Sequence, residues 1–183
     1  MGANSALIFD IIINVAILLV FFRFLMQLAA VNPYNPVVMS TAKATKIVDI
    51  FGSILPTVGK GRVNLAALVL VFLLYFLKVF GSKYLNVQPT GSTVYFVLST
   101  LLAMLQSLIT ILKYLLFAYI ISSWIVMLTQ SRSPYIEVLQ ELAEPMLAPF
   151  RRIMPNMGMI DLSPILAFFT LHIAEKMLEY LVF

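Results

Sequence analysis

The stretch from Thr93 to Leu128 constrains this chain more than any other feature. It contains no glycine, no proline and a single charged residue, Lys113. One helix over the whole stretch would be about 54 Å long, at 1.5 Å per residue. The hydrocarbon core of a bilayer is only about 30 Å thick. The stretch therefore predicts a membrane helix with either an extension or a second span.

The composition of the whole chain agrees with a membrane protein. Of its 183 residues, 62% are hydrophobic and only 11% are charged, whereas about a quarter of the residues in a soluble protein are charged. A soluble domain of this size would have too few charges to cover its surface. We therefore predict an all-α membrane protein with one membrane domain, residues 1–183. The lack of cysteine excludes disulfides, thiolate metal sites and cysteine nucleophiles.

Four apolar segments are predicted to cross the bilayer, which takes about 20 residues each. The first is expected to remain as a helix, because no Lys or Arg precedes it as in a signal peptide. The last begins at Ser163-Pro164, a capping hydroxyl followed by a first-turn proline. A polar stripe at helical spacing favours an interfacial or tilted helix at 93–110, although two full spans within 93–128 stay open. The four predicted spans are about 7–28, 64–80, 111–128 and 164–183.

The basic residues predict the orientation of these spans. Of twelve Lys and Arg residues, eight lie in or next to two long connections, 29–63 and 129–163. Because connections rich in Lys and Arg stay on the cytoplasmic side, both are predicted to be cytoplasmic, and both termini to face outward. An extra span at 93–110 would put the connections on opposite sides, which favours four spans. The eight residues are Arg23, Lys43, Lys46, Lys60, Arg62, Arg132, Arg151 and Arg152.

The two halves of the sequence resemble each other. Pro56-Thr57-Val58-Gly59 returns as Pro155-Asn156-Met157-Gly158, 99 positions later, before the second and fourth predicted spans. Tyr34-Asn35-Pro36 occupies the place that Arg132-Ser133-Pro134-Tyr135 has in the second half. Each motif is a helix-breaking turn.

An amphipathic segment lies between the turns of each half, at 37–55 and at 135–146. We therefore predict two tandem parallel repeats, residues 1–82 and 93–183, each a hairpin with a cytoplasmic amphipathic helix. Inverted repeats are common in alternating-access transporters, although parallel ones occur there too.

At these positions the sequence resembles the YggT family of bacterial membrane proteins, over nearly the whole chain. The first half has Tyr34-Asn35-Pro36 and then departs from the family, with Gly52-Ser53 in place of an arginine pair and Arg62 in place of an aspartate. The second half carries the specific motifs, which are Ser131-Arg132-Ser133-Pro134, Glu144-Pro145, Pro149 to Pro155 and Gly158 to Pro164.

The resemblance implies a multi-pass protein of the bacterial cytoplasmic (inner) membrane, with both termini periplasmic in the predicted orientation. It also implies a poorly defined activity. Family members are linked to osmotic stress and potassium homeostasis, or lie near cell-division genes. Chloroplast relatives are associated with haem attachment to a cytochrome b and with nucleoid distribution. This range favours an accessory or assembly role.

Arg151 and Arg152 form the first candidate site. Guanidinium groups pair bidentately with phosphate, so these arginines are candidates for binding anionic lipid headgroups or an acidic segment of a partner. The alternative is an ordinary anchor that follows the positive-inside rule. Asp161 is close enough to return to either arginine and fix the turn before the last span. The residues expected to build the repeated turns are Asn35, Pro36, Pro149, Pro155, Gly158, Ser163 and Pro164.

Ionisable residues are also predicted inside the membrane. His172, the only histidine, is a candidate haem ligand, but only with a partner chain or a second ligand; the alternative is a neutral histidine bonded across helices. No other cofactor and no metal is expected. Charges at similar depth are expected to pair, because unpaired charges in lipid are costly, and a stabilising cluster is favoured over an ion path. Its predicted members are Asp10, Lys78, Lys113 and Glu175.

No catalytic motif is present, since the sequence lacks HExxH, GxSxG, phosphate-loop and paired-histidine patterns. The favoured function is a non-enzymatic accessory or scaffold protein that engages lipids or a membrane complex through its amphipathic connections. One alternative is a channel or transporter component for osmotic stress and potassium homeostasis, and another is a haem or cofactor assembly factor. The expected partners are the lipid bilayer and a membrane protein or second copy of this chain, not nucleic acid.

Overall fold

The structure, a computed structural model, describes residues 3–85, 93–130, 133–153 and 161–182. These residues form helices and one short antiparallel ribbon, in which Thr57 pairs with Asn64 and Val58 with Val63. The elements in chain order are α1 (Ala3–Leu28), α2 (Pro36–Ala44), α3 (Ile47–Gly52), β1 (Thr57–Val58), β2 (Val63–Asn64), α4 (Leu65–Leu85), α5 (Thr93–Thr129), α6 (Pro134–Ile153) and α7 (Ser163–Val182).

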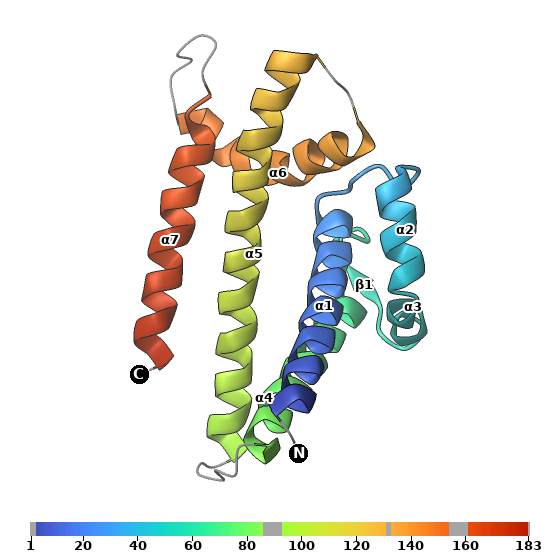
Figure 1. The fold of residues 1–183 in the computed structure, drawn as a ribbon. Helices are drawn as coiled ribbons and strands as arrows, with labels where there is room; N and C mark the ends of the chain where they lie inside the picture. Colours follow the sequence, from blue (N-terminus) through green and yellow to red (C-terminus); the bar gives the residue numbers. More distant parts are fainter. Residues whose placement is uncertain (1–2, 86–92, 131–132, 154–160, 183) are drawn as a thin grey trace.

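Four long helices, α1, α4, α5 and α7, run lengthwise through the molecule, and α6 lies across their direction (Figure 1). Helix α1 packs on α4, α4 on α5, and α5 on α7, while α6 contacts α5, α7 and α2. Phe21 of α1, Val71 of α4 and Leu116 of α5 are fully buried in the shared core. Helices α1 and α4 approach closely at Gly81, where a Cβ atom would lie 2.9 Å from the Phe9 ring.

Two helices are long and apolar enough to cross a membrane, over Ala6–Leu28 and Val94–Thr129. Leu65–Gly81 of α4 is apolar but shorter, and α7 carries Glu175, Lys176 and Glu179. The fold is thus all-helical apart from the ribbon, within the described ranges, and it has two candidate membrane spans.

Helix α5 differs from the prediction because it does not break near residue 110. It is one helix of 37 residues, about 55 Å long, and it projects past α6 (Figure 1). The polar stripe does not interrupt it, because hydroxyls bond to carbonyls one turn earlier: Thr100 to Phe96 at 2.8 Å and Thr110 to Gln106 at 3.0 Å. The chain does not reverse within 93–129, as two full spans would require.

In both halves, a polar side chain followed by proline caps the start of a helix. Asn35 caps α2 by accepting a hydrogen bond from the Val37 amide at 2.9 Å, and Pro36 follows it. Ser133 accepts from the Ile136 amide at 3.3 Å before α6. Side chains before helices also cap α4 and α7, as shown below.

One predicted turn residue lies inside a helix. Pro149, like Pro145, is within α6, which continues to Ile153. A proline removes one backbone hydrogen bond and crowds the preceding turn, but both rings lie on the exposed side of α6, where the freed carbonyls can bond to water or headgroups. The prediction of a turn at Pro149 is therefore wrong. Pro155 and Gly158 lie outside the described residues.

Candidate functional site

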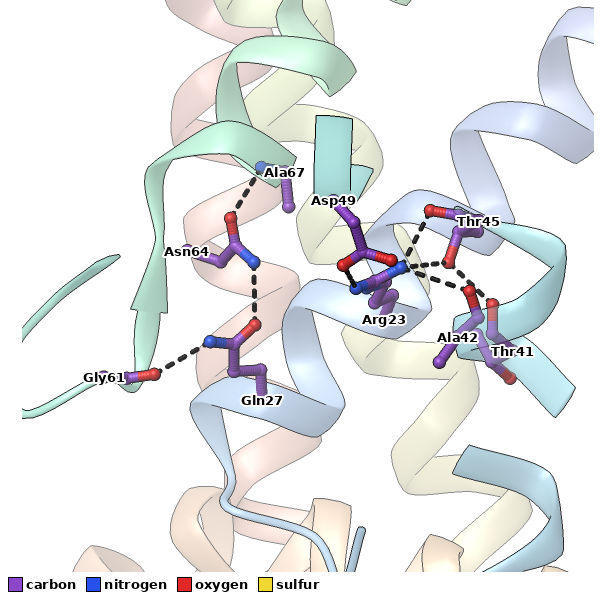
Figure 2. Close-up of polar contacts among 9 residues, drawn as sticks. All are labelled: Arg23, Gln27, Thr41, Ala42, Thr45, Asp49, Gly61, Asn64 and Ala67. Carbon is purple, nitrogen blue, oxygen red and sulfur yellow. Dashed lines mark hydrogen bonds and ion pairs between the residues drawn. The ribbon is translucent and has the colours of Figure 1, made fainter. Parts of the chain in front are cut away.

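A polar network centred on Arg23 of α1 holds the first connection against the long helices (Figure 2). Nη1 donates to the carbonyls of Ala42 and Thr45, at 3.2 and 2.8 Å, and Nη2 forms an ion pair with Asp49. The Arg23 side chain is only 16% exposed. One guanidinium thus fixes α2, α3 and the turn between them to α1.

Gln27, one turn further along α1, extends this network to α4 (Figure 2). Its Nε2 donates to the Gly61 carbonyl, and its Oε1 accepts from Asn64 Nδ2, both at 2.8 Å. Asn64 in turn caps α4 by accepting from the Ala67 amide at 3.0 Å. The ribbon turn and the start of α4 are therefore held by the same face of α1.

Arg151 of α6 is the centre of the corresponding network in the second half. Its Nη1 pairs with Glu144 at 2.5 Å, its Nε with Asp161 at 2.9 Å, and its Nη2 donates to the Tyr119 hydroxyl at 3.1 Å. Asp161 also accepts from the Ser163 amide at 2.9 Å, at the start of α7. Arg151 therefore joins α5, α6 and the turn before α7.

The charges in this second network adjust each other's pKa. Burial alone would lower the pKa of Arg151, but its bonds to Glu144 and Asp161 outweigh burial and raise that pKa. Burial alone would raise the pKa of Asp161, but bonds from Ser163 and Arg151 lower it below the ordinary value of 3.8. Both groups are therefore held in their charged forms.

The two predicted arginines have different surroundings. Asp161 returns to Arg151, as the sequence allowed, whereas Arg152 is exposed. Within the described ranges Arg152 has no hydrogen-bond or ion-pair partner. Arg151 is thus occupied by two carboxylates, and Arg152 alone remains open to a ligand or partner.

The networks are linked across the two halves by backbone groups. The Asn32 amide donates to Glu141 of α6 at 2.8 Å, and Asn35 Nδ2 donates to the Pro134 carbonyl at 3.1 Å. Asn35 thus caps α2 and also binds the first residue of α6. The first turn of one half and the transverse helix of the other form one assembly.

The predicted intramembrane charges separate into two groups. Lys113 of α5 pairs with Glu175 of α7 at 2.5 Å, and His172 Nδ1 lies 3.4 Å from Lys113 Nζ. Lys78 of α4 instead donates to Asn14 of α1 at 2.8 Å. Asp10 has no partner for its carboxylate in the part of the chain that the structure describes. No single cluster of the four residues forms there.

The sequence interpretation missed the role of Arg23, Gln27, Asn64 and Tyr119. Of these four roles, that of Arg23 could most readily have been predicted from the sequence, because a charge inside an apolar run needs a partner. Asp49 is the only acidic residue between Asp10 and Glu137. The scarcity of carboxylates therefore pointed to an Arg23–Asp49 pair.

These features define an all-helical protein with two candidate membrane spans, in which half-buried charges tie the connecting segments to the long helices. The chain belongs to the CCB3/YggT family, whose pattern matches it twice, over residues 3–85 and 98–182. The family predicted from the sequence motifs is confirmed.

Bacterial relatives match most of the chain. It is 32% identical over 182 residues to an uncharacterized protein of Pseudomonas aeruginosa, covering 96% of this chain and 89% of that protein. It is 33% identical over 172 residues to the uncharacterized protein in the proC 3′ region of Vibrio alginolyticus, covering 92% and 87%. It is 29% identical over 164 residues to the uncharacterized protein YggT of Escherichia coli K12, covering 88% and 82%. No solved structure matches the chain.

Proposed function

We propose that this protein is a non-enzymatic scaffold of the bacterial cytoplasmic membrane, which presents α6 as a rigid platform to a membrane-protein partner. The observation that carries the proposal is the anchoring of α6 at both ends. Asn35 binds the carbonyl of Pro134 at the first residue of α6, and Arg151 near its last residue binds Tyr119 and Asp161. A helix fixed in this way keeps one face in a constant position for a partner.

The proposal includes four spans in two tandem parallel repeats, with both termini periplasmic. Helix α1 begins and α7 ends on the side of the molecule away from α6 (Figure 1). The two family matches, over 3–85 and 98–182, support a repeat. The first connection is rich in exposed Lys and Arg, which supports a cytoplasmic placement of this end.

The exposed side of α6 suggests the chemistry of the partner. Its apolar side is directed into the bundle, where Val138, Leu142 and Leu147 are buried. The other side exposes Glu137, Gln140, Glu141 and Glu144. Glu144 also pairs with Arg151 and Glu141 with the Asn32 amide, so Glu137 is the carboxylate there without a side-chain partner among the described residues. An acidic face repels anionic headgroups and complements a basic segment. We therefore assign α6 to a partner protein with a basic segment, in place of the lipid role considered for Arg151 and Arg152.

Affinity capture of the full-length protein from native bacterial membranes tests the proposal. The test variant carries Glu137→Gln and Gln140→Lys on α6; the control carries Ser40→Lys and Thr57→Lys and has the same change in formal charge. We expect one stoichiometric partner with the wild type and the control, and at least tenfold less with the test variant, at equal membrane abundance. Equal capture by all three proteins, or no stoichiometric partner at all, would contradict the docking role.

The transport and haem alternatives find less support in the described residues. Lys113 and Glu175 form an ion pair between α5 and α7. Leu115 and Leu116, two and three residues further along α5, are buried apolar side chains and do not continue a polar path. His172 directs Nδ1 toward Lys113. Potassium flux into liposomes that requires Glu175, or a Soret absorption band in the purified protein, would replace the scaffold by one of these functions.

A further inference from the structure

The connection between α1 and α4 presents a surface that the scaffold role does not use. Cations and large apolar side chains are both exposed on it; for example, Ile50 is 67% and Ile54 79% exposed. We call it the first-half surface. It consists of Lys43, Lys46, Lys60 and Arg62, together with Met39, Ile47, Ile50, Ile54 and Val58, all of them exposed.

Four of these nine residues recur at regular intervals along the α2–α3 segment. Ile47 and Ile50 are three residues apart within α3, which is helical spacing, and Lys43 and Ile54 lie four residues before and after them. Thr41, Thr45 and Val48 of the same segment are buried and turned to the bundle. The segment is therefore amphipathic, but its apolar outer residues are mixed with cations rather than covered by protein.

The charge of the first-half surface is not balanced locally. Asp49 is the only acidic residue in the connection, and the ion pair with Arg23 occupies its carboxylate. The four cations of the surface have no hydrogen-bond or ion-pair partner within residues 3–85, 93–130, 133–153 and 161–182. A partner for this surface must therefore supply negative charge next to an apolar phase.

The polar network holds this surface beside a candidate membrane span. Arg23 and Gln27 lie in the last two turns of α1, and they bind α2, α3 and the ribbon turn directly. Figure 1 shows α2 beside the C-terminal half of α1 and α3 nearer the middle of that helix. Isoleucine side chains at such a boundary can enter the acyl region while lysines remain among headgroups, as in interfacial helices.

We propose that the first-half surface binds the anionic headgroups of the leaflet next to it, with Lys43, Lys46, Lys60 and Arg62 contacting phosphate and the isoleucines contacting acyl chains. This inference rests on the membrane placement in the proposed function but does not depend on a partner at α6. The two connections then have separate roles: the basic one binds lipid, and the acidic one binds protein.

Lipid binding to the purified full-length protein in non-ionic detergent tests this. Phosphatidylglycerol and phosphatidylcholine are added in equal amounts, and bound lipid is counted by native mass spectrometry. A basic residue near an anionic surface strengthens binding about fivefold, so Lys43→Gln with Lys46→Gln is expected to reduce bound phosphatidylglycerol about 10- to 25-fold. The charge-matched control, Arg152→Gln with Lys176→Gln, is expected to change it by less than about twofold.

A second variant tests the apolar half of the proposal. Ile50→Ser with Ile54→Ser is expected to weaken the binding of both lipids, since it removes acyl contacts and leaves the cations. Thermal unfolding of every variant shows whether it is folded. Undiminished phosphatidylglycerol binding by the lysine variant, or an equal loss in the control, would overturn the proposal.

Affinity capture separates this proposal from the scaffold role. The lysine variant is expected to retain the partner that binds α6, because the two surfaces lie on different connections. If that variant lost a protein partner and kept its bound phosphatidylglycerol, the first-half surface would be a protein site and the lipid proposal would fail. Loss of capture in the α6 variant alone would leave the lipid result unaffected.

Discussion

The two halves fasten their connections to the long helices from opposite directions. In the first half the arginine belongs to the long helix, and Arg23 of α1 reaches outward to Thr45 and Asp49. In the second half the arginine belongs to the connection, and Arg151 of α6 reaches inward to Tyr119 of α5. In both halves an arginine therefore ties the connection to a long helix, but it lies on the long helix in the first half and on the connection in the second.

This reversal explains a departure from the family pattern. The first half has Gly52-Ser53 where the resemblance leads one to expect an arginine pair. Arg23 supplies the missing charge from α1. The outer faces of the connections differ in charge, basic in the first half and acidic on α6, where Glu144 also pairs with Arg151.

The largest effect is expected for Arg23→Gln. The side chain is 16% exposed, and its loss leaves Asp49 and backbone carbonyls without a donor. Charged hydrogen bonds contribute about 1.5–3 kcal/mol, so unfolding should become easier by about 3 kcal/mol, or roughly 6–12 °C in Tm. Thermal unfolding in detergent measures this. Lys43→Gln, an exposed cation of the same connection, is the control and should shift Tm by less than about 2 °C.

If the two variants unfold at the same temperature, Arg23 is not a fastening residue. The first half would then have no arginine with a role that corresponds to that of Arg151.

Arg151→Gln should have a smaller effect than Arg23→Gln. The Arg151 side chain is 34% exposed, against 16% for Arg23, and solvent screens the ion pairs of a more exposed charge. We expect a loss of about 2 kcal/mol and lower membrane abundance. The neighbouring Arg152→Gln is the control, and its stability should change by less than about 0.5 kcal/mol. Equal effects of the two substitutions would restore the arginines as one functional pair.

The sequence predicts the parts of this fold that depend on local signals. Apolar runs indicate α1 and α5, and Asn35-Pro36 and Ser163-Pro164 lie where helices begin. Adjacent residues on a helix point about 100° apart, which is why Arg151 turns inward while Arg152 stays exposed. That difference cannot be predicted without knowing which side of α6 packs on the bundle.

The predicted break in α5 near residue 110 was wrong because the polar side chains there form hydrogen bonds within the helix. The hydroxyl of Thr110 bonds within its own helix and also to Glu175, so the polar stripe of α5 does not mark an end. Long-range pairing was the hardest to predict, because Arg23 and Asp49 are joined only by the path of the connection between them. The small number of acidic residues was the one sequence feature that limited the possible ion-pair partners of Arg23.

The smallest expected effect concerns Asp161, whose contribution depends on pH. Its pKa in the folded protein lies below the ordinary value of 3.8. The stabilisation is therefore fully present above that value, and it is lost as the pH falls through the lower pKa of the folded state. Asp161→Asn should cost about 1 kcal/mol at pH 7, because it weakens both the cap of α7 and the pair with Arg151.

The difference in Tm between the wild type and Asp161→Asn should stay constant from pH 7 to about pH 5, and should shrink below about pH 4. Arg151 stays protonated throughout this range, so it adds no pH dependence of its own. Glu137→Gln removes an exposed carboxylate of α6 that has no side-chain partner within the described ranges, and it serves as the control. A difference that persists unchanged at pH 3 would show that Asp161 acts through its shape and not its charge, and the second fastening would then rest on Glu144 and Tyr119 alone.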